Sequence, residues 1–404
     1  MEGSIIRIIY IGYVVPEEEV EKNQAVSAPA NAMGLGILKS LFDEFGDSLY
    51  SINIKPVAGY RRSKTLFVKR TKEILFDGFT TFSVGFVNLP LIKQVTIILS
   101  IAMRMAILLW SLRTCHKVLV ITVNSNAIVS IPVYLTKVIK KTTKICYMSD
   151  YPLQNARTKN PFRNLGIACD NFIRKRSLKM YQASITFVKK CADYFMPAKP
   201  TLVIDHIFDE RGYRERLEAN VSAQEGVVRI VYTGSLNENY RIQEMMECIE
   251  YLPSNYMLEF YGKGPLMNTV AKFAKNNPRV KYCGFLLPKD IPFVQMNASI
   301  LITLLRSDLP LSEFAIPSKI VGYLASGRPV ISSRAESIPE KYRKYLNFVD
   351  SEEPKDIATK ILEITHKNRY LEFERKALQA RDFIYGECNW NIQTEQIVRF
   401  ISSL

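Results

Sequence analysis

Short runs of four to seven apolar residues recur along the first half of the chain, and the stretches between them carry apolar residues at helical spacing. Alternating strands and helices of these lengths predict βα units around a parallel sheet that is covered on both faces. The expected strands span residues 5–11, 50–54, 117–123, 144–148, 183–187 and 201–204. The expected helices span residues 31–45, 91–112, 127–140, 162–181 and 189–195.

The alternation restarts after residues 209–226, a polar stretch that is typical of a linker. A chain of 404 residues also suits two domains better than one. We therefore predict two doubly wound, Rossmann-like α/β domains at 1–207 and 227–385, with a linker at 208–226. Ligands bind beyond the carboxyl ends of the strands in such sheets, so we expect the domains to face each other across a cleft. The expected strands of the second domain span 227–232, 257–261, 280–283, 299–304 and 329–332, and the expected helices span 241–251, 265–276, 289–296 and 317–326.

Residues 95–112 are apolar over nearly the length of a membrane span, but Arg104 lies in their middle. A charge at the centre of a bilayer costs at least about 2.5 kcal/mol. We therefore expect a buried or half-buried helix, with interfacial membrane contact as the alternative.

Charge is concentrated in the first half of the chain. Residues 1–205 hold 28 basic and 14 acidic side chains, and the rest of the chain is nearly balanced, for a net charge of +15. This asymmetry favours an anionic partner such as a membrane surface, a phosphorylated acceptor or nucleic acid. The alternative is a basic surface that serves solubility.

Composition argues against several kinds of site. The seven cysteines are scattered without a CxxC pair, which argues against a disulfide scaffold and against a structural zinc site and fits a reducing cytoplasm. Only three histidines are present, far apart in sequence, and the amino terminus has no secretory signal pattern. We therefore expect no metal site and a cytoplasmic protein.

The first candidate for ligand chemistry follows the strand at 227–232. Gly234 and Ser235 form a small turn in which a phosphate can approach backbone amides, and Arg241 lies near the start of the next helix. A guanidinium there can bind a phosphate in bidentate fashion. Alternatively, this is an ordinary strand-to-helix turn with a surface arginine.

Two other glycine pairs are weaker signals. Gly262 and Gly264 follow the strand at 257–261, and Gly34 and Gly36 lie well after the first strand. Neither pair is followed by the third glycine of a dinucleotide-binding motif. Both remain candidate binding positions.

The most informative stretch is IPSKIVGYLASGRPVI, residues 316–331. Pro317 at the expected helix start and Gly327 beyond its end delimit a short helix. Ser318 and Lys319 then lie beside its first amide groups, where a diphosphate would meet a dipole, a hydroxyl and an ammonium. The alternative is a well-capped helix with a solvent-facing lysine.

The segment PSKIVGYLASGRPVI closely resembles the signature helix of GT4-type glycosyltransferases of the GT-B fold. The segments VYTGSL, LEFYGKGP and VKYCGFLLPKDIPFVQMNASILITLL resemble further parts of that family's nucleotide-sugar domain, in the same order. The resemblance covers roughly residues 228–404. The first half is similar only through its first strand, a glycine-bearing helix start at Gly34 and Gly36, and Asp150 after a strand, on what is the acceptor side in that family.

The resemblance implies a retaining transfer of a sugar from a nucleoside diphosphate sugar without a metal, and no D-x-D motif is present. By family position, Arg241 and Lys319 would hold the diphosphate and stabilise the leaving group, assisted by Ser235 and Ser318. Retention in this family is attributed to same-face attack helped by the leaving phosphate. The terminal helix, residues 386–404, would pack back on the first domain.

One departure from the family concerns the glutamate that binds the nucleotide ribose. Gly322 stands at that position, and Phe314 stands where the other glutamate of the usual pair would fall, with Glu313 adjacent. We expect Glu313 to contact the donor. Donor affinity or nucleotide choice would differ from the family's, and a degenerate member that binds without efficient transfer is the alternative.

Two further residues carry open alternatives. Asp150 would act as general base for the acceptor hydroxyl, or would cap the turn before Pro152. His206 lies where the chain crosses between the domains and is expected to be a packed or hinge residue.

The sequence therefore predicts a glycosyltransferase of polysaccharide or glycolipid assembly. Its partners would be a nucleotide sugar, a glycan or lipid-phosphate-linked acceptor, and an anionic membrane surface at the inner face of the plasma membrane. Nucleic-acid binding is a weaker alternative, because the basic residues lack interleaved aromatic side chains.

Overall fold

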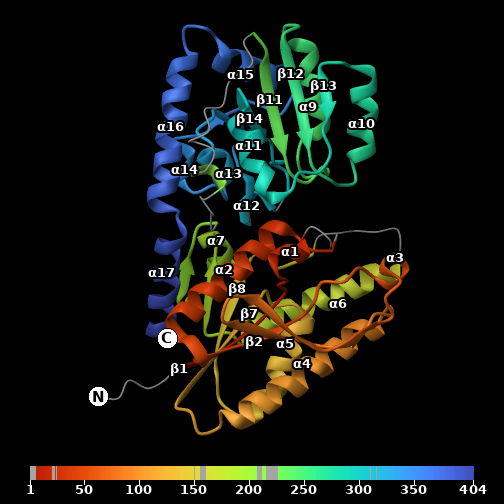
Figure 1. Ribbon diagram of the computed structural model, residues 1–404, viewed down its shortest axis with the longest axis vertical. Coiled ribbons are helices and arrows are strands. Elements are labelled where there is room, and N and C mark those ends of the chain that lie inside the picture. Colours follow the sequence, from red (N-terminus) through yellow and green to blue (C-terminus); the bar gives the residue numbers. More distant parts are fainter. Residues whose placement is uncertain are drawn as a thin grey trace. The chain divides into compact units, whose positions relative to one another are not determined.

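The computed structural model (Figure 1) describes residues 6–20, 23, 25–149, 151–154, 161–206, 212–214, 226–309, 311–314 and 316–404. The chain forms two compact units. The first consists of Met1–Ile207 with Asn391–Leu404, and the second of Phe208–Trp390. We refer to them as the amino-terminal and carboxy-terminal domains.

The amino-terminal domain is built on an eight-stranded sheet in the order β10-β9-β8-β7-β1-β2-β5-β4. Its paired strands are parallel except β4, which is antiparallel to β5. The apolar runs of the sequence are the central strands. They are apolar throughout because both faces of these strands are covered. The strands are β1 (Ile6–Gly12), β2 (Leu49–Asn53), β4 (Thr71–Phe76), β5 (Phe79–Ser83), β7 (Lys117–Val123), β8 (Thr143–Met148), β9 (Ala183–Thr186) and β10 (Thr201–Val203), and β3 (Phe67–Val68) pairs separately with β6 (Phe86–Val87).

The predicted parallel sheet carries an antiparallel strand at its β4 edge. Strands β4 and β5 form a hairpin, and β3 and β6 a second antiparallel pair, in a region where no strand was predicted. The burial of β4 is low, with Leu75 its buried residue. An edge strand with few buried side chains lacks the continuous apolar run that marks the central strands.

Helices cover both faces of this sheet. They are α1 (Glu17–Val20), α2 (Ala28–Phe45), α3 (Tyr60–Ser63), α4 (Ile92–Ser111), α5 (Ala127–Leu135), α6 (Pro161–Leu178) and α7 (Lys189–Phe195), with 3-10 turns η1 (Gly46–Ser48) and η2 (Thr136–Val138). The helix predicted at 127–140 ends early, at Leu135, and continues as η2. Pro132 lies inside α5 and its carbonyl accepts a hydrogen bond from Thr136 Oγ1.

Helix α4 is half-buried, as expected for residues 95–112. Its inner face, including Ile97, Ile101 and Met105, packs in one core with residues of β1, β2 and β7. By length and composition α4 could also cross a membrane. Its inner face is already occupied by the sheet, so a membrane could meet only the opposite face.

The carboxy-terminal domain holds a six-stranded parallel sheet in the order β13-β12-β11-β14-β15-β16. Two buried apolar clusters lie in this domain, one with Ile230 and Phe260 and the other with Val231 and Leu301. Since Ile230 and Val231 are successive residues of β11, the clusters lie on opposite faces of the sheet. The strands are β11 (Val228–Thr233), β12 (Tyr256–Tyr261), β13 (Val280–Tyr282), β14 (Ile300–Thr303), β15 (Val330–Ser332) and β16 (Asn347–Phe348).

Short helices join these strands. They are α9 (Ile242–Glu247), α10 (Met267–Asn276), α11 (Ile291–Met296), α12 (Leu311–Phe314), α13 (Lys319–Ala325), α14 (Glu340–Arg343), α15 (Pro354–Thr365) and α16 (Tyr370–Glu387), with 3-10 turns η3 (Cys248–Tyr251) and η4 (Pro288–Asp290). Strand order reverses between β11 and β14, which are neighbours although β12 and β13 lie between them in sequence. Such a reversal is where open α/β sheets bind ligands.

The last helix, α17 (Trp390–Ser403), belongs almost entirely to the amino-terminal domain. Ser40 and Thr394 share a hydrogen bond of 2.6 Å between their hydroxyls, and the Asp205 amide donates to Gln393 Oε1 at 3.0 Å. The terminal segment predicted at 386–404 begins later, at Asn391, because α16 continues to Glu387.

Candidate functional site

The strand-order reversal brings two loops together in the carboxy-terminal domain. Tyr240, in the loop after β11, bridges to Leu305 after β14. The Arg241 amide donates to the Leu304 carbonyl at 3.1 Å. These contacts hold Tyr240 and Arg241, at the start of α9, beside the carboxyl end of β14.

Three glycines allow the turns after β11 and β12 to touch through their backbones. The Gly234 amide donates to the Tyr261 carbonyl at 2.8 Å. A Cβ on Gly262 would lie 1.7 Å from the Gly234 carbonyl oxygen, and one on Gly264 would lie 2.1 Å from the Leu236 carbonyl oxygen. Gly234 and Gly262 also have φ of +142° and +147°, which side chains rarely tolerate. Close backbone packing therefore requires these glycines, whether or not a ligand binds.

Gly234 has a second role, because it leaves room for Lys319. A Cβ on Gly234 would lie 2.0 Å from Lys319 Cε. The ammonium beyond it lies 3.2 Å from the ring centroid of Tyr240 and donates to Tyr232 Oη at 2.9 Å. Tyr232 Oη in turn donates to the Ser235 carbonyl at 2.6 Å. The lysine of α13 is thus placed beside the turn that follows β11.

The Lys319 ammonium is held by aromatic groups. Among the described residues, no carboxylate lies within ion-pairing distance of it. Burial lowers the pKa of Lys319 well below its usual value. A desolvated ammonium with only a hydroxyl and ring faces around it gains from an anionic ligand, which would also favour its charged form.

Arg241 is in the opposite situation. Its Nε lies 2.5 Å from Glu352 Oε2, its Nη1 lies 2.9 Å from Glu244 Oε1, and its Nη2 lies 4.0 Å from Asp308 Oδ1. Burial, which lowers the pKa of Arg241, is outweighed by Glu352 and Glu244, which raise it. A phosphate at Arg241 must therefore compete with carboxylates that already bind the guanidinium.

The other predicted donor-site residues differ in burial and in their position relative to α13. The helix begins at Lys319, not Pro317, and Ser318 is its amino-terminal cap without a side-chain cap hydrogen bond. Pro317 is buried and Ser318 is exposed. Glu313 is half-buried on α12. Ser235 Oγ accepts a hydrogen bond of 2.8 Å from Asn237 Nδ2.

Gly322 lies against a buried polar network. A Cβ at this position would be 3.0 Å from Tyr213 Oη and 3.6 Å from Gln295 Oε1. Tyr213 Oη donates to Gln295 Oε1 at 2.6 Å, and Gln295 Nε2 donates to Thr233 Oγ1 at 2.9 Å. A longer side chain at 322 would have to displace the Tyr213 hydroxyl.

The predicted acceptor-side residues lie elsewhere. Gly34 and Gly36 are in the amino-terminal domain, and they are buried inside α2 instead of opening a helix, because α2 starts at Ala28. A Cβ on Gly34 would lie 2.6 Å from Val14 Cγ1, so this glycine allows close helix packing. Asp150 lies outside the described residues. The His206 ring stacks on Phe187 with centroids 4.0 Å apart.

Sequence reasoning missed the groups that surround the two cations. Tyr232 and Tyr240 flank the turn at Gly234, so their aromatic character was a local signal that could have found them. Glu352 is 111 residues from Arg241 in sequence and carried no such signal. Among the described residues, no group of three or more His, Cys, Asp or Glu side chains could hold a metal.

Solved structures with the same architecture define the class of fold. The HepE protein of Anabaena in complex with UDP-glucose is similar over 98% of this chain and 100% of its own, with TM-score 0.65 and 14% identity. Sucrose-phosphate synthase from Thermosynechococcus elongatus is similar over 98% of both chains, with TM-score 0.66 and 12% identity. A glycosyltransferase from Rickettsia africae is similar over 98% of both chains, with TM-score 0.60 and 13% identity. The chain therefore has the GT-B fold of two Rossmann-like α/β domains.

The sequence comparison points to the same class through the carboxy-terminal domain. Residues 227–367 match the family model described as glycosyl transferases group 1. No curated protein matches the chain. The family match supports glycosyl transfer by the carboxy-terminal domain, and the solved structures show the fold.

Proposed function

We propose that the protein is a retaining, GT4-type hexosyltransferase. It moves a sugar from a nucleoside diphosphate sugar to a glycan or lipid-phosphate-linked acceptor in surface polysaccharide or glycolipid synthesis. It works without a metal, in the cytoplasm, at the inner face of the membrane. The match of residues 227–367 supports the transfer, and the UDP and UDP-glucose bound to HepE support a nucleotide sugar as donor.

The observation that carries the proposal is the Lys319 ammonium. It lies beside the turn after β11, at the strand-order reversal, bound to Tyr232 and Tyr240 without a carboxylate among the described residues. A diphosphate placed there would supply the missing negative charge. Because charge develops on the diphosphate as the sugar leaves, this cation would stabilise the transition state more than the ground state.

The proposed reaction breaks the bond between the anomeric carbon and the diphosphate oxygen and forms a bond to the acceptor oxygen on the same face. The acceptor proton passes to the leaving phosphate, or to Asp150 acting as base. Arg241 would bind the diphosphate once the diphosphate has displaced one of the carboxylates that now contact the guanidinium. Glu313, Pro317, Ser318 and the amides near Gly234, Ser235, Gly262 and Gly264 would complete the donor site, with Gly34 and Gly36 on the acceptor side.

A thermal-shift screen against UDP, GDP, ADP and CMP sugars tests donor binding, followed by assays of sugar hydrolysis and transfer. Lys319→Ala should reduce turnover about 10²–10³-fold, as loss of one transition-state donor does elsewhere. Lys272→Ala is the matched control, since Lys272 is an exposed lysine on α10 of the same domain. Wild-type turnover in Lys319→Ala would refute the phosphate role.

A degenerate protein that binds nucleotide without efficient transfer is the second candidate. It is favoured by Gly322, where the family's ribose-binding glutamate is absent and the Tyr213 hydroxyl stands close by. A nucleotide that raises the melting temperature, with no hydrolysis or transfer from any nucleotide sugar, would support this candidate.

A further inference from the structure

One face of α4 is an exposed row of large apolar side chains. Ile92, Val95, Leu99, Met103, Ile107 and Trp110 recur every three or four residues and are 47–64% exposed. We call these six residues the α4 apolar face. It runs most of the length of a 20-residue helix, about 30 Å. Exposed apolar surfaces of this extent mark interaction sites.

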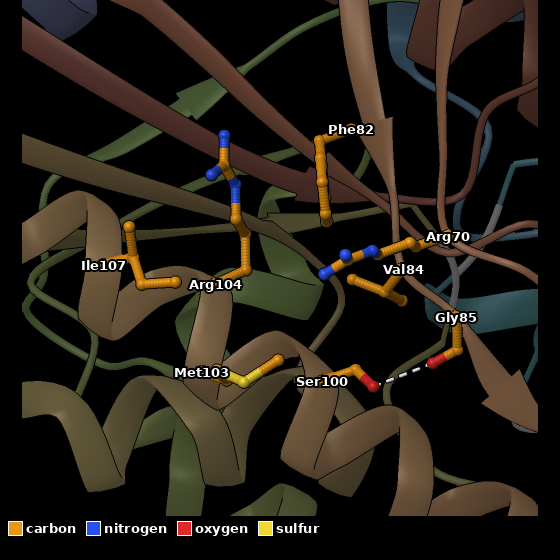
Figure 2. Close-up of a pocket in the computed structure, with 8 residues that line it drawn as sticks. All are labelled: Arg70, Phe82, Val84, Gly85, Ser100, Met103, Arg104 and Ile107. Atoms are coloured by element: carbon orange, nitrogen blue, oxygen red, sulfur yellow. Dashed lines mark hydrogen bonds between the residues drawn. The ribbon is translucent and has the colours of Figure 1, made fainter.

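A basic pocket opens beside the α4 apolar face. The cavity, of about 290 Å³, is lined by Arg70, Phe82, Arg104 and both Met103 and Ile107 of that face. Figure 2 shows Arg104 and Ile107 rising from α4 while Arg70 reaches in from the opposite wall. The same pocket is thus bordered by apolar side chains and by two guanidinium groups.

No described acidic residue pairs with the arginines of this pocket. The Arg104 guanidinium lies 4.4 Å from the Phe82 ring centroid, and no described residue accepts a hydrogen bond from its buried Nε. Within the described part of the chain, neither Arg70 nor Arg104 forms an ion pair. Two guanidinium groups without carboxylates, one with a buried unpaired donor, are suited to a phosphate.

From residue 78 to residue 149 the charged side chains all have one sign. Residues 78–149, which include α4, α5 and the strands between and beyond them, contain eight Lys or Arg and no Asp or Glu. Tyr134, Leu135 and Val138, at the end of α5 and in η2, are also exposed, and Lys137 lies among them. Helices α4 and α5 pack against each other, which keeps these groups on neighbouring elements.

We propose that the α4 apolar face docks on the surface of an anionic lipid bilayer and that Arg70 and Arg104 bind one lipid phosphate in the adjacent pocket. Apolar side chains enter the boundary of the acyl chains while basic groups meet the head groups, which is how amphipathic helices bind such surfaces. The inference rests on the membrane location proposed above and gives it a defined surface.

Other occupants fit the surface less well. A second copy of the chain would bring the same basic residues against each other, without acidic groups in residues 78–149 to pair with them. Nucleic acid would use the basic residues but would leave a mainly aliphatic row unused, since only Trp110 of the α4 apolar face offers a ring for base stacking.

The test is flotation of the full-length protein with vesicles of phosphatidylcholine, alone or with equimolar phosphatidylglycerol, at low and high salt. We expect binding to the anionic vesicles that weakens with salt. The double variant R70Q/R104Q should bind more weakly by about fivefold for each lost charge. L99Q/I107Q, which changes two exposed positions, should lose about tenfold or more.

Matched controls lie in the other domain. K272Q/K275Q removes two charges from exposed positions of α10, and L371Q removes an exposed leucine from α16; both should bind vesicles like the wild type. Unchanged vesicle binding in R70Q/R104Q or in L99Q/I107Q would overturn the proposal. So would losses of equal size in the controls.

Three further results would assign the surface to another occupant and overturn the proposal. In the first, the protein does not bind vesicles, but inorganic phosphate raises its melting temperature and R70Q/R104Q abolishes that shift. The second is a dimer in gel filtration that L99Q/I107Q dissociates, without vesicle binding. The third is salt-dependent oligonucleotide binding that R70Q/R104Q removes, again without vesicle binding.

The thermal shift by UDP-glucose, measured on the same variants, separates this inference from the proposed transfer activity. We expect it to be unchanged, because both changed surfaces lie in the amino-terminal domain. Vesicle binding without any response to nucleotide sugars would count against the transferase alone. Nucleotide binding without vesicle binding would count against the docking surface alone.

Discussion

The two domains share a layered α/β plan but present their candidate chemistry in different ways. In the carboxy-terminal domain, the turns after β11 and β12 are in backbone contact. The Lys319 side chain passes close to Gly234, and its ammonium lies between Tyr232 and Tyr240. In the amino-terminal domain, the α4 apolar face lies in a segment without acidic residues, residues 78–149, and Arg70 and Arg104 line the adjacent pocket. The first arrangement suits a small charged ligand and the second suits an extended surface.

The difference follows from what each ligand requires. A diphosphate is recognised by a few groups placed to within a fraction of an ångström, so close packing and glycines are needed. A bilayer is recognised by accumulated apolar area and charge, which tolerates variation in each residue. Single substitutions should therefore have larger effects in the carboxy-terminal turns than on the surface of the amino-terminal domain.

Gly262→Ala should give the largest effect. The new Cβ would meet the Gly234 carbonyl at 1.7 Å, at a φ of +147°. Overpacking and backbone strain together should lower the free energy of unfolding by about 2–5 kcal/mol. Chemical denaturation measures it, and a loss below about 1 kcal/mol would show that the two turns can separate easily.

Lys319→Met should stabilise the protein at neutral pH by about 1–3 kcal/mol, because it removes a desolvated charge. Burial lowers the pKa of Lys319 in the folded protein below 10.5, its ordinary value. Between these two pKa values the lysine is protonated in the unfolded chain and neutral in the folded protein. Wild-type stability therefore rises with pH through this window, and the advantage of Lys319→Met should shrink as pH approaches 10.5.

Thermal denaturation across pH checks this sign. Lys263→Met, at an exposed position in the neighbouring turn, is the matched control. An advantage of Lys319→Met that grew with pH would contradict the buried environment of the ammonium, to which no described residue contributes a carboxylate.

Glu352→Gln should tighten diphosphate binding about two- to tenfold, equivalent to about 0.5–1.5 kcal/mol. The carboxylate now lies 2.5 Å from Arg241 Nε and competes with a phosphate for the guanidinium. Calorimetry with UDP measures the change. Glu363→Gln, which breaks ion pairs with Lys360 and Arg369 in the same domain, should leave UDP binding unchanged. Weaker UDP binding in Glu352→Gln would mean that Glu352 orients Arg241 instead of competing for it.

Gly166→Ala should give the smallest effect, with the opposite sign to Gly262→Ala. Gly166 is exposed inside α6, and a Cβ there would meet no atom of a described residue within 4 Å. Alanine should stabilise the amino-terminal domain by about 0.5–1 kcal/mol. A lower free energy of unfolding in Gly166→Ala, measured by chemical denaturation, would contradict the expected difference between this glycine and Gly262.

Much of the fold could be predicted from the pattern of the chain. The strand at Lys117–Val123 and the helix at Lys189–Phe195 have the predicted bounds, because a continuous apolar run and clear helical spacing mark them. The β4–β5 hairpin could not be predicted, since its exposed edge gives no such run. Two helix starts were predicted inexactly: the helix predicted at 31–45 starts at Ala28, and the helix predicted at 317–326 starts at Lys319.

The candidate site was predictable only where its residues are neighbours in sequence. Gly234, Ser235 and Arg241 stand on one loop, and Lys319 follows a marked helix boundary. The residues that contact them in space are distant in sequence. Glu352 contacts Arg241, and Tyr213 lies close to Gly322. No local pattern reports such contacts.

The amino-acid sequence by itself determined the alternation of strands and helices, the two-domain plan and the excess of basic residues in the first half, because periodicity and composition act locally. Tertiary structure decided which cation is available to a ligand. Lys319 was placed among tyrosines and Arg241 among carboxylates, since folding sets the desolvation and the neighbours of a charge. It also decided which face of α4 remains exposed, because the sheet covers only the other one.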